Sequence, residues 1–171
     1  VLVASEAPTA VVTGIRGNIR PRRIDCIGQA GHSGAVPRDQ RHDAVFAAAR
    51  LIAALDDHWS DRVAAGEDLV VPTGIIETDA NAHSMSRIPG EVSFSFEARS
   101  QSNQTLESCY ALLKAECARI GVERGVEFSF DRRVDSAPAR MDQAWIDCLV
   151  QHSGYLGLPQ ETIASGAGHD A

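Results

Sequence analysis

The last six residues of the chain hold its clearest pattern for chemistry. They read GAGHDA, so that His169 follows directly on a run of glycine, alanine and glycine. Glycine adds no Cβ bulk, and an imidazole beside it can approach a cation or an anionic intermediate closely. A hydrolytic zinc centre needs about three protein ligands and an open position. One histidine does not make that site, so we expect the other ligands to lie outside this chain, which is then a piece of an enzyme.

A second histidine stands in a segment of small residues. Residues 28–37 read GQAGHSGAVP, and three glycines with a proline predict a loop that carries His32 outward. From the loop composition alone, His32 is an ordinary solvent-exposed histidine. The segment becomes informative only in combination with the other motifs below.

An arginine closes the most regular strand pattern in the chain. Residues 91–99 alternate apolar and polar side chains, and Arg99 falls on the polar side. The planar guanidinium suits bidentate binding of a carboxylate. The alternative is an ordinary solvated arginine at the end of a strand.

The elements that must position these groups follow from periodicity. We expect strands at 15–27 with a kink near Pro21, at 69–78, at 91–99 and at 126–130. Helices are expected at 39–59 and at 103–120, with Gly121 as the stop of the second. The order β-α-β-β-α-β predicts an α+β fold of the ferredoxin-like split βαβ type, a four-stranded antiparallel sheet with two helices on one face. A further helix at 141–155 has no partner in this unit, so the two ends of the chain are expected to belong to a second domain.

The composition narrows the class of protein. The chain has 171 residues, enough for one ordinary domain or for a smaller domain with parts of a neighbour. A net charge of -7 without a long acidic run argues against nucleic-acid binding. Four widely spaced cysteines without a CxxC pair favour buried thiols in a reducing cytoplasm. No apolar stretch approaches the roughly 20 residues that span a bilayer. The chain also opens on Val1 without an initiator methionine, as a processed or excised chain would.

Five segments occur in an order that resembles a known family. They are TGIRG at 13–17, GQAGHSGAVP at 28–37, RIPGEV at 87–92, FEARS at 96–100 and SGAGHDA at 165–171. Together they resemble the M20 family of metallopeptidases, in its amidase, hydantoinase and carbamoylase branch. This branch includes N-carbamoyl-L-amino-acid hydrolases and allantoate amidohydrolases.

The resemblance implies a domain organisation and a metal requirement. Residues 1–12 would be a remnant of a catalytic α/β domain, 13–135 an inserted dimerisation or lid domain, and 136–171 the return into the catalytic domain. Such enzymes use two divalent metal ions, zinc or sometimes manganese, and His169 would be the last ligand. The other ligands have no counterpart here, so this chain alone is expected to bind no metal pair and to be inactive. A homodimer through the lid domain is also implied.

The resemblance also assigns site residues. His32 would cross the dimer interface and donate to the substrate carbonyl or oxyanion in the partner's active site. Arg99 would bind the substrate carboxylate, and Gly166 would line the substrate pocket through its backbone. A further substrate contact would come from His83 or, if the register differs by two, from Asn81. Glu97 stands where the family has an aspartate.

The implied function is metal-dependent hydrolysis of a linear amide or carbamoyl C–N bond in a small, carboxylate-bearing substrate. Two alternatives remain open at this point. One is an aminoacylase-like or dipeptidase-like member of the same family. The other, from a different class, is a stand-alone ferredoxin-like binding module with no catalytic parent.

Overall fold

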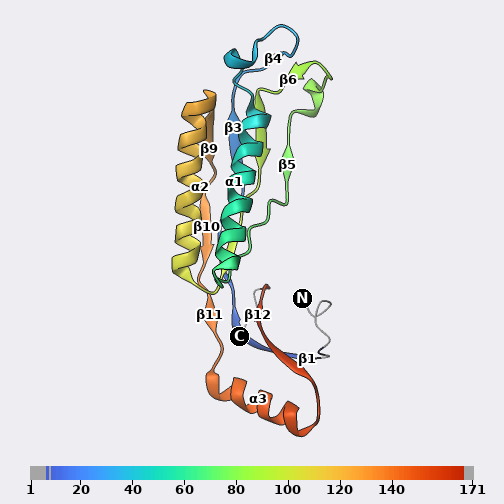
Figure 1. Ribbon diagram of the computed structural model, residues 1–171, viewed down its shortest axis with the longest axis vertical. Coiled ribbons are helices and arrows are strands. Elements are labelled where there is room, and N and C mark those ends of the chain that lie inside the picture. Colours follow the sequence, from blue (N-terminus) through green and yellow to red (C-terminus); the bar gives the residue numbers. More distant parts are fainter. Residues whose placement is uncertain (1–6, 8, 168–171) are drawn as a thin grey trace.

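The structure, a computed structural model, describes Ala7 and residues 9–167 of an elongated molecule (Figure 1). Its helix–sheet lobe contains α1 (Ala44–Ala64) and α2 (Asn103–Arg124), which lie side by side along the long axis. Its terminal lobe contains α3 (Gln143–Tyr155). Within the described residues, no helix is long and apolar enough to cross a membrane.

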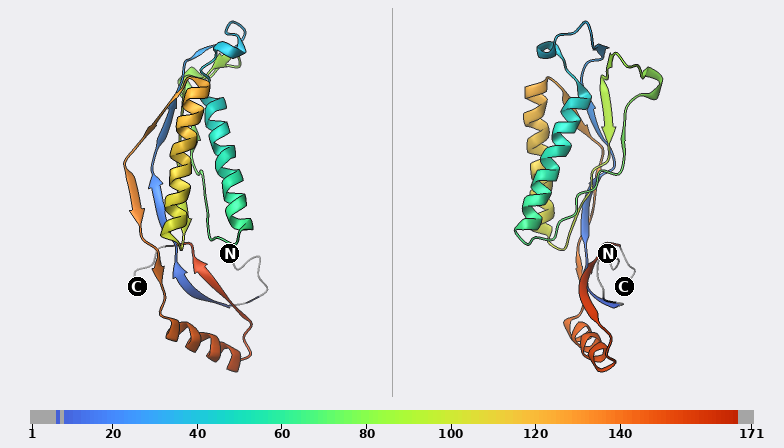
Figure 2. Two further views of the ribbon diagram at one scale, coloured as in Figure 1. Left: turned by 60° about the vertical axis from the view of Figure 1, so that its left-hand side comes forward. Right: turned by 45° about the vertical axis from the view of Figure 1, so that its right-hand side comes forward.

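The helix–sheet lobe is built on an antiparallel sheet of four strands. In spatial order they are β5 (Ile76–Glu77), β7 (Glu91–Phe94), β3 (Ile24–Ile27) and β9 (Glu127–Phe130). Both helices cover one face of this sheet (Figure 2). The α+β class predicted from the sequence is confirmed, and the expected antiparallel sheet is present.

Two of the predicted strands, 15–27 and 91–99, are each divided between two sheets. Residues 15–27 form β2 (Gly17–Pro21) and then β3, because Pro21 has no N–H to donate to a ladder. Residues 91–99 form β7 and then β8 (Ala98–Ser100). A separate antiparallel sheet joins β2 to β8 and to β10 (Arg133–Ser136), a strand that the sequence pattern did not predict.

The ends of both long helices differ from those that periodicity suggested. Asp43 accepts hydrogen bonds from the N–H groups of Val45 and Phe46, so α1 starts at Ala44, and the preceding residues Arg38–Gln40 form a short 3-10 helix. Gly121 does not end α2. The helix ends at Gly125, which has φ of 64° and whose Cβ, if it had one, would collide with the His42 ring.

The hydrophobic core lies between these two helices and the sheet. The apolar stripe of each helix faces inward against Ile24, Val92 and Phe94. Phe96 and Ala98 are buried as well, as the alternation in 91–99 predicts. Three of the four cysteines, Cys26, Cys109 and Cys117, are buried as free thiols. Burial is the main cause that raises the pKa of these thiols, to about 12, 11 and 12, so they stay protonated at neutral pH.

The terminal lobe is a second packing unit. β1 (Thr9–Ile15) pairs in parallel with β12 (Gln160–Ser165) and antiparallel with β11 (Ala139–Arg140), and α3 packs against β1. Strands 9–15 and 160–165 are separated by nearly the whole chain, so no local pattern indicates that they pair. The helix predicted at 141–155 is confirmed, with Asp142 as its N-cap.

Candidate functional site

The predicted site residues fall at two ends of the molecule. The far end of the helix–sheet lobe, here named the tip, comprises residues 28–42 and 78–90. It carries the short pair of β4 (Gly31–His32) and β6 (Arg87–Ile88) at the top of Figure 1. The other end, here named the joint, lies where β2 and β8 meet the terminal lobe.

His32 is held at the tip with one ring nitrogen fixed. Its backbone pairs with Arg87 in β6, and its carbonyl accepts from the N–H groups of Ala35 and Val36. The N–H of Gly34 donates to His32 Nδ1 at 3.1 Å. An Nδ1 that accepts carries no proton, so in the neutral ring the proton sits on Nε2. The exposed imidazole therefore presents an N–H donor to whatever approaches the tip.

The loop that carries His32 is stiffened by Arg41. Its Nε donates to the carbonyl of Val36 at 2.9 Å, and its Nη2 donates to the carbonyl of Ser33. Two bonds from one planar guanidinium fix the loop without any contact to the imidazole. The loop predicted at 28–37 is present except for the two residues of β4, and the sequence did not indicate this anchor.

His83 and Asn81 differ in what their side chains face. His83 lies within 2.7 Å of the Thr78 hydroxyl through Nε2 and lines a cavity of 730 Å³ beside the tip strands. Asn81 is in the short helix Ala80–Ala82, capped by Asp79, and does not line that cavity. Of the two, only His83 lines this cavity, and which of them contacts a substrate stays a prediction.

At the joint, two residues separated by 67 positions in sequence meet. Arg99 Nη1 donates to the carbonyl oxygen of Gly166 at 2.6 Å. Arg99 Nη2 donates to Glu97 Oε2 at 2.9 Å. The backbone of Arg99 is fixed as well, since it pairs with Asn18 in β2 and exchanges two 2.9 Å hydrogen bonds with Val70. The structure thus brings together the two residues that the resemblance assigned to substrate binding in this part of the chain.

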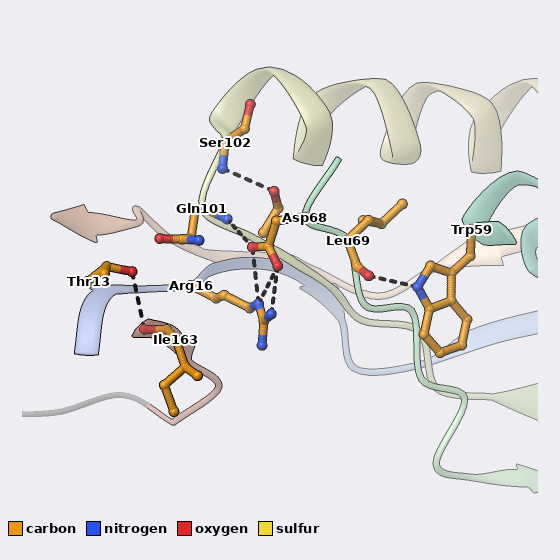
Figure 3. Close-up of polar contacts among 9 residues, drawn as sticks. Thr13, Arg16, Trp59, Asp68, Leu69, Gln101, Ser102 and Ile163 are labelled. Atoms are coloured by element: carbon orange, nitrogen blue, oxygen red, sulfur yellow. Dashed lines mark hydrogen bonds and ion pairs between the residues drawn. The ribbon is translucent and has the colours of Figure 1, made fainter. Parts of the chain in front are cut away.

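The joint also contains an ion pair between Arg16 and Asp68 that the sequence did not suggest (Figure 3). Arg16 Nε lies 2.9 Å and 3.0 Å from the two oxygens of Asp68, and Arg16 Nη2 lies 2.6 Å from Oδ1. The N–H of Gln101 also donates to Asp68, at 2.9 Å. Burial opposes ionisation of this carboxylate, but the hydrogen bonds from Arg16 and Gln101 outweigh it and lower the pKa of Asp68.

The described residues do not supply a set of metal ligands. His169 lies outside them, so its predicted role as a ligand remains a prediction. Among residues 7 and 9–167, no group of three or more His, Cys, Asp or Glu side chains is placed to hold a metal ion. The part of the chain that the structure describes does not fit a metal centre by itself.

Residues 13–125 match the family described as the M20 peptidase dimerisation domain. The chain belongs to this family. Relatives place it in the hydantoinase and carbamoylase branch of the amidases. It is 27% identical to an N-carbamoyl-L-amino-acid amidohydrolase of Pseudomonas sp. over 96% of this chain and 38% of that protein. It is 29% identical to an allantoate amidohydrolase of Bacillus subtilis, over 94% of this chain and 38% of that protein.

A solved structure of the same family also matches this chain. The crystal structure of an amidase of the hydantoinase/carbamoylase family from Burkholderia multivorans matches with a TM-score of 0.91 and 28% identity. The match covers 100% of this chain and 40% of that one. This M20 chain therefore spans about two-fifths of the length of the relatives that it matches.

Proposed function

We propose that this chain is the dimerisation and lid part of an amidohydrolase that cleaves a linear amide or carbamoyl C–N bond. The substrate is a small molecule that carries a carboxylate. The observation that carries this proposal is the match to the M20 dimerisation domain together with relatives named as amidohydrolases. The contact of Arg99 with Gly166 at 2.6 Å supports it, because it joins a guanidinium of the lid to the strand end of the terminal lobe. The β3-α1-β5-β7-α2-β9 order supports the ferredoxin-like assignment of the lid.

The separation of the tip from the joint supports a site shared by two protomers. A histidine and an arginine at opposite ends of one elongated molecule do not act on the same small substrate within that molecule. Two copies related by a twofold axis can place the tip of one beside the joint of the other. In this arrangement Arg99 binds the carboxylate, and the Nε2–H of the partner's His32 stabilises the developing oxyanion.

The surface that we assign to the twofold contact is formed by α1 and β5. β5 is the outer strand at one edge of the four-stranded sheet. At this edge Ile75 and Ile76 are exposed, and an apolar groove of 610 Å³ runs between α1 and residues 71–78. An edge strand with adjacent apolar side chains suits pairing with its own copy. The description of the matched family as a dimerisation domain supports a second copy as the occupant.

The divalent metal ions implied by the resemblance, zinc or manganese, would polarise the scissile carbonyl and supply hydroxide. The described residues do not form their donor set, so these residues act only by binding and orienting the substrate. We place the metal ligands in the remaining part of the full-length enzyme, with His169 as the ligand contributed by this chain.

The assay that tests the proposal compares three substrate classes. The full-length protein, supplied with zinc or manganese, is expected to hydrolyse N-carbamoyl amino acids or allantoate faster than N-acetyl amino acids and dipeptides. A preference for N-acetyl amino acids or dipeptides would indicate an aminoacylase or dipeptidase instead. Residues 1–171 alone, titrated with zinc, are expected to give no turnover, and turnover by this chain would refute the division of the site.

A further inference from the structure

We propose that Glu97 is the positioning residue of the substrate site: it fixes the direction in which Arg99 presents its guanidinium. This inference rests on the proposed function, in which Arg99 binds the substrate carboxylate. It assigns a role to a side chain that touches no substrate. It also explains why a partly buried acidic residue stands two positions before the arginine on the same side of the chain.

The first step is that the backbone of Arg99 is held by strand pairing on both sides. Arg99 pairs with Asn18 of β2 on one side and with Val70 on the other. Only the side-chain torsions remain free, and an arginine side chain has several of them. Without further contacts, the guanidinium would sample many positions around a fixed Cα.

The second step is that two contacts remove this freedom. Glu97 Oε2 accepts from Arg99 Nη2 at 2.9 Å, and the Gly166 carbonyl accepts from Nη1 at 2.6 Å. Arg99 Nε is buried and makes no hydrogen bond within the described residues. A guanidinium has two N–H groups on each terminal nitrogen. One N–H therefore remains on Nη1 and one on Nη2, which matches the two oxygens of a carboxylate.

The third step is that Glu97 is the inner member of the pair. Its side chain is 16% exposed, whereas that of Arg99 is 36% exposed. Arg20 Nη1 lies 3.9 Å from Glu97 Oε1, so a second cation, itself 47% exposed, also stabilises the charge of the glutamate. Two arginines on one carboxylate leave a net positive charge, which favours an anionic ligand at the outer face of Arg99. Glu97 thus orients Arg99 without cancelling the attraction.

The test measures KM and kcat of the full-length enzyme on N-carbamoyl-L-alanine and on its carboxamide. For Glu97→Gln, we expect KM for the carboxylate substrate to rise about tenfold while kcat changes little, because a charge-assisted contact in the ground state is lost. KM for the carboxamide is expected to stay constant. Glu97→Asp keeps the charge and is expected to recover part of the effect. The matched control is Glu107→Gln, which breaks the ion pair of an exposed glutamate with Arg133 and touches neither Arg99 nor Gly166.

Equal losses on both substrates would overturn the proposal, since a merely structural role would affect them alike. So would an unchanged KM in Glu97→Gln. The second measurement is the crystal structure of the Glu97→Gln protein, in which Arg99 Nη1 is expected to leave the Gly166 carbonyl. If the guanidinium stays in place, the proposal is wrong even if the wild-type enzyme acts on neither substrate. Lack of wild-type turnover would by itself refute only the proposed function.

Discussion

The tip and the joint hold their functional groups by different means. His32 at the tip is exposed, and its loop is fixed by Arg41, by hydrogen bonds within residues 28–42 and by the pairing with β6, all of them within the tip. Arg99 at the joint is partly buried and is fixed by Glu97, which directly precedes β8, and by Gly166, the residue after β12. A group held locally on an exposed end can be offered to another molecule. A group held by distant segments acts where the two lobes of one molecule meet.

The two regions also differ in their dependence on the fold. The tip needs only a short strand pair and a turn. The joint needs the terminal lobe in place, because Gly166 and the β1–β12 pairing come from the two ends of the described chain. The predictions below test this contrast, from the largest expected effect to the smallest.

The shared site is tested most sharply by combining two impaired variants of the full-length enzyme in one dimer. His32→Ala is expected to lower kcat by about 100-fold to 1,000-fold, since an oxyanion donor is lost. Arg99→Ala is expected to raise KM for carboxylate substrates strongly. Hybrid dimers made by co-expression contain one intact site, so statistical mixing should restore about a quarter of the wild-type activity. If the hybrids stay inactive, His32 and Arg99 do not act across a dimer.

The dimer contact itself is tested by placing a charge on the α1–β5 surface. Ile76→Asp is expected to raise the dimer dissociation constant about 100-fold, because a carboxylate would be buried in an apolar contact. The matched control is Val122→Asp on α2, at an apolar residue that is 89% exposed but lies away from this surface. Sedimentation velocity separates monomer from dimer. If the dimer persists in Ile76→Asp but dissociates in Val122→Asp, the interface lies on α2 and the assignment to α1 and β5 is wrong.

The joint is tested through the free energy of unfolding of the chain. Asp68→Asn is expected to lower it by about 1–3 kcal/mol at neutral pH, because the ion pair with Arg16 and the Gln101 bond are weakened. The folded pKa of Asp68 is lowered, so its contribution is present above the unfolded value of 3.8 and is lost as pH falls through the folded value. Wild type and variant should therefore converge in strong acid.

Urea titrations between pH 2 and 7 measure this difference. The control Glu123→Gln removes an exposed partner of Arg50 and Arg119 and is expected to have a smaller effect at every pH. A constant difference between wild type and Asp68→Asn down to pH 2 would contradict the assignment.

The helix–sheet lobe was largely predictable because its signals are local. The alternation in 91–99 correctly indicated that Val92, Phe94, Phe96 and Ala98 are buried. The α2 stripe was also correct, but its stop was not, since Gly121 is tolerated inside the helix and Gly125 takes the positive φ that ends it. The division of 15–27 and 91–99 between two sheets had no local signal, because each half pairs with a different distant strand.

The sequence by itself determined the kinds of groups present and the loops and strands that carry them: a loop histidine at 32, a strand-end arginine at 99 and a glycine-rich segment from 166. Spacing and side-chain chemistry suffice for this, because they are properties of neighbouring residues. Only the tertiary structure decided that Arg99 meets Gly166 and Glu97, that Arg16 meets Asp68, and that His32 stands apart from all of them. These contacts join segments that the chain separates by up to 67 residues, and pairing over such distances depends on how the whole sheet and both lobes pack.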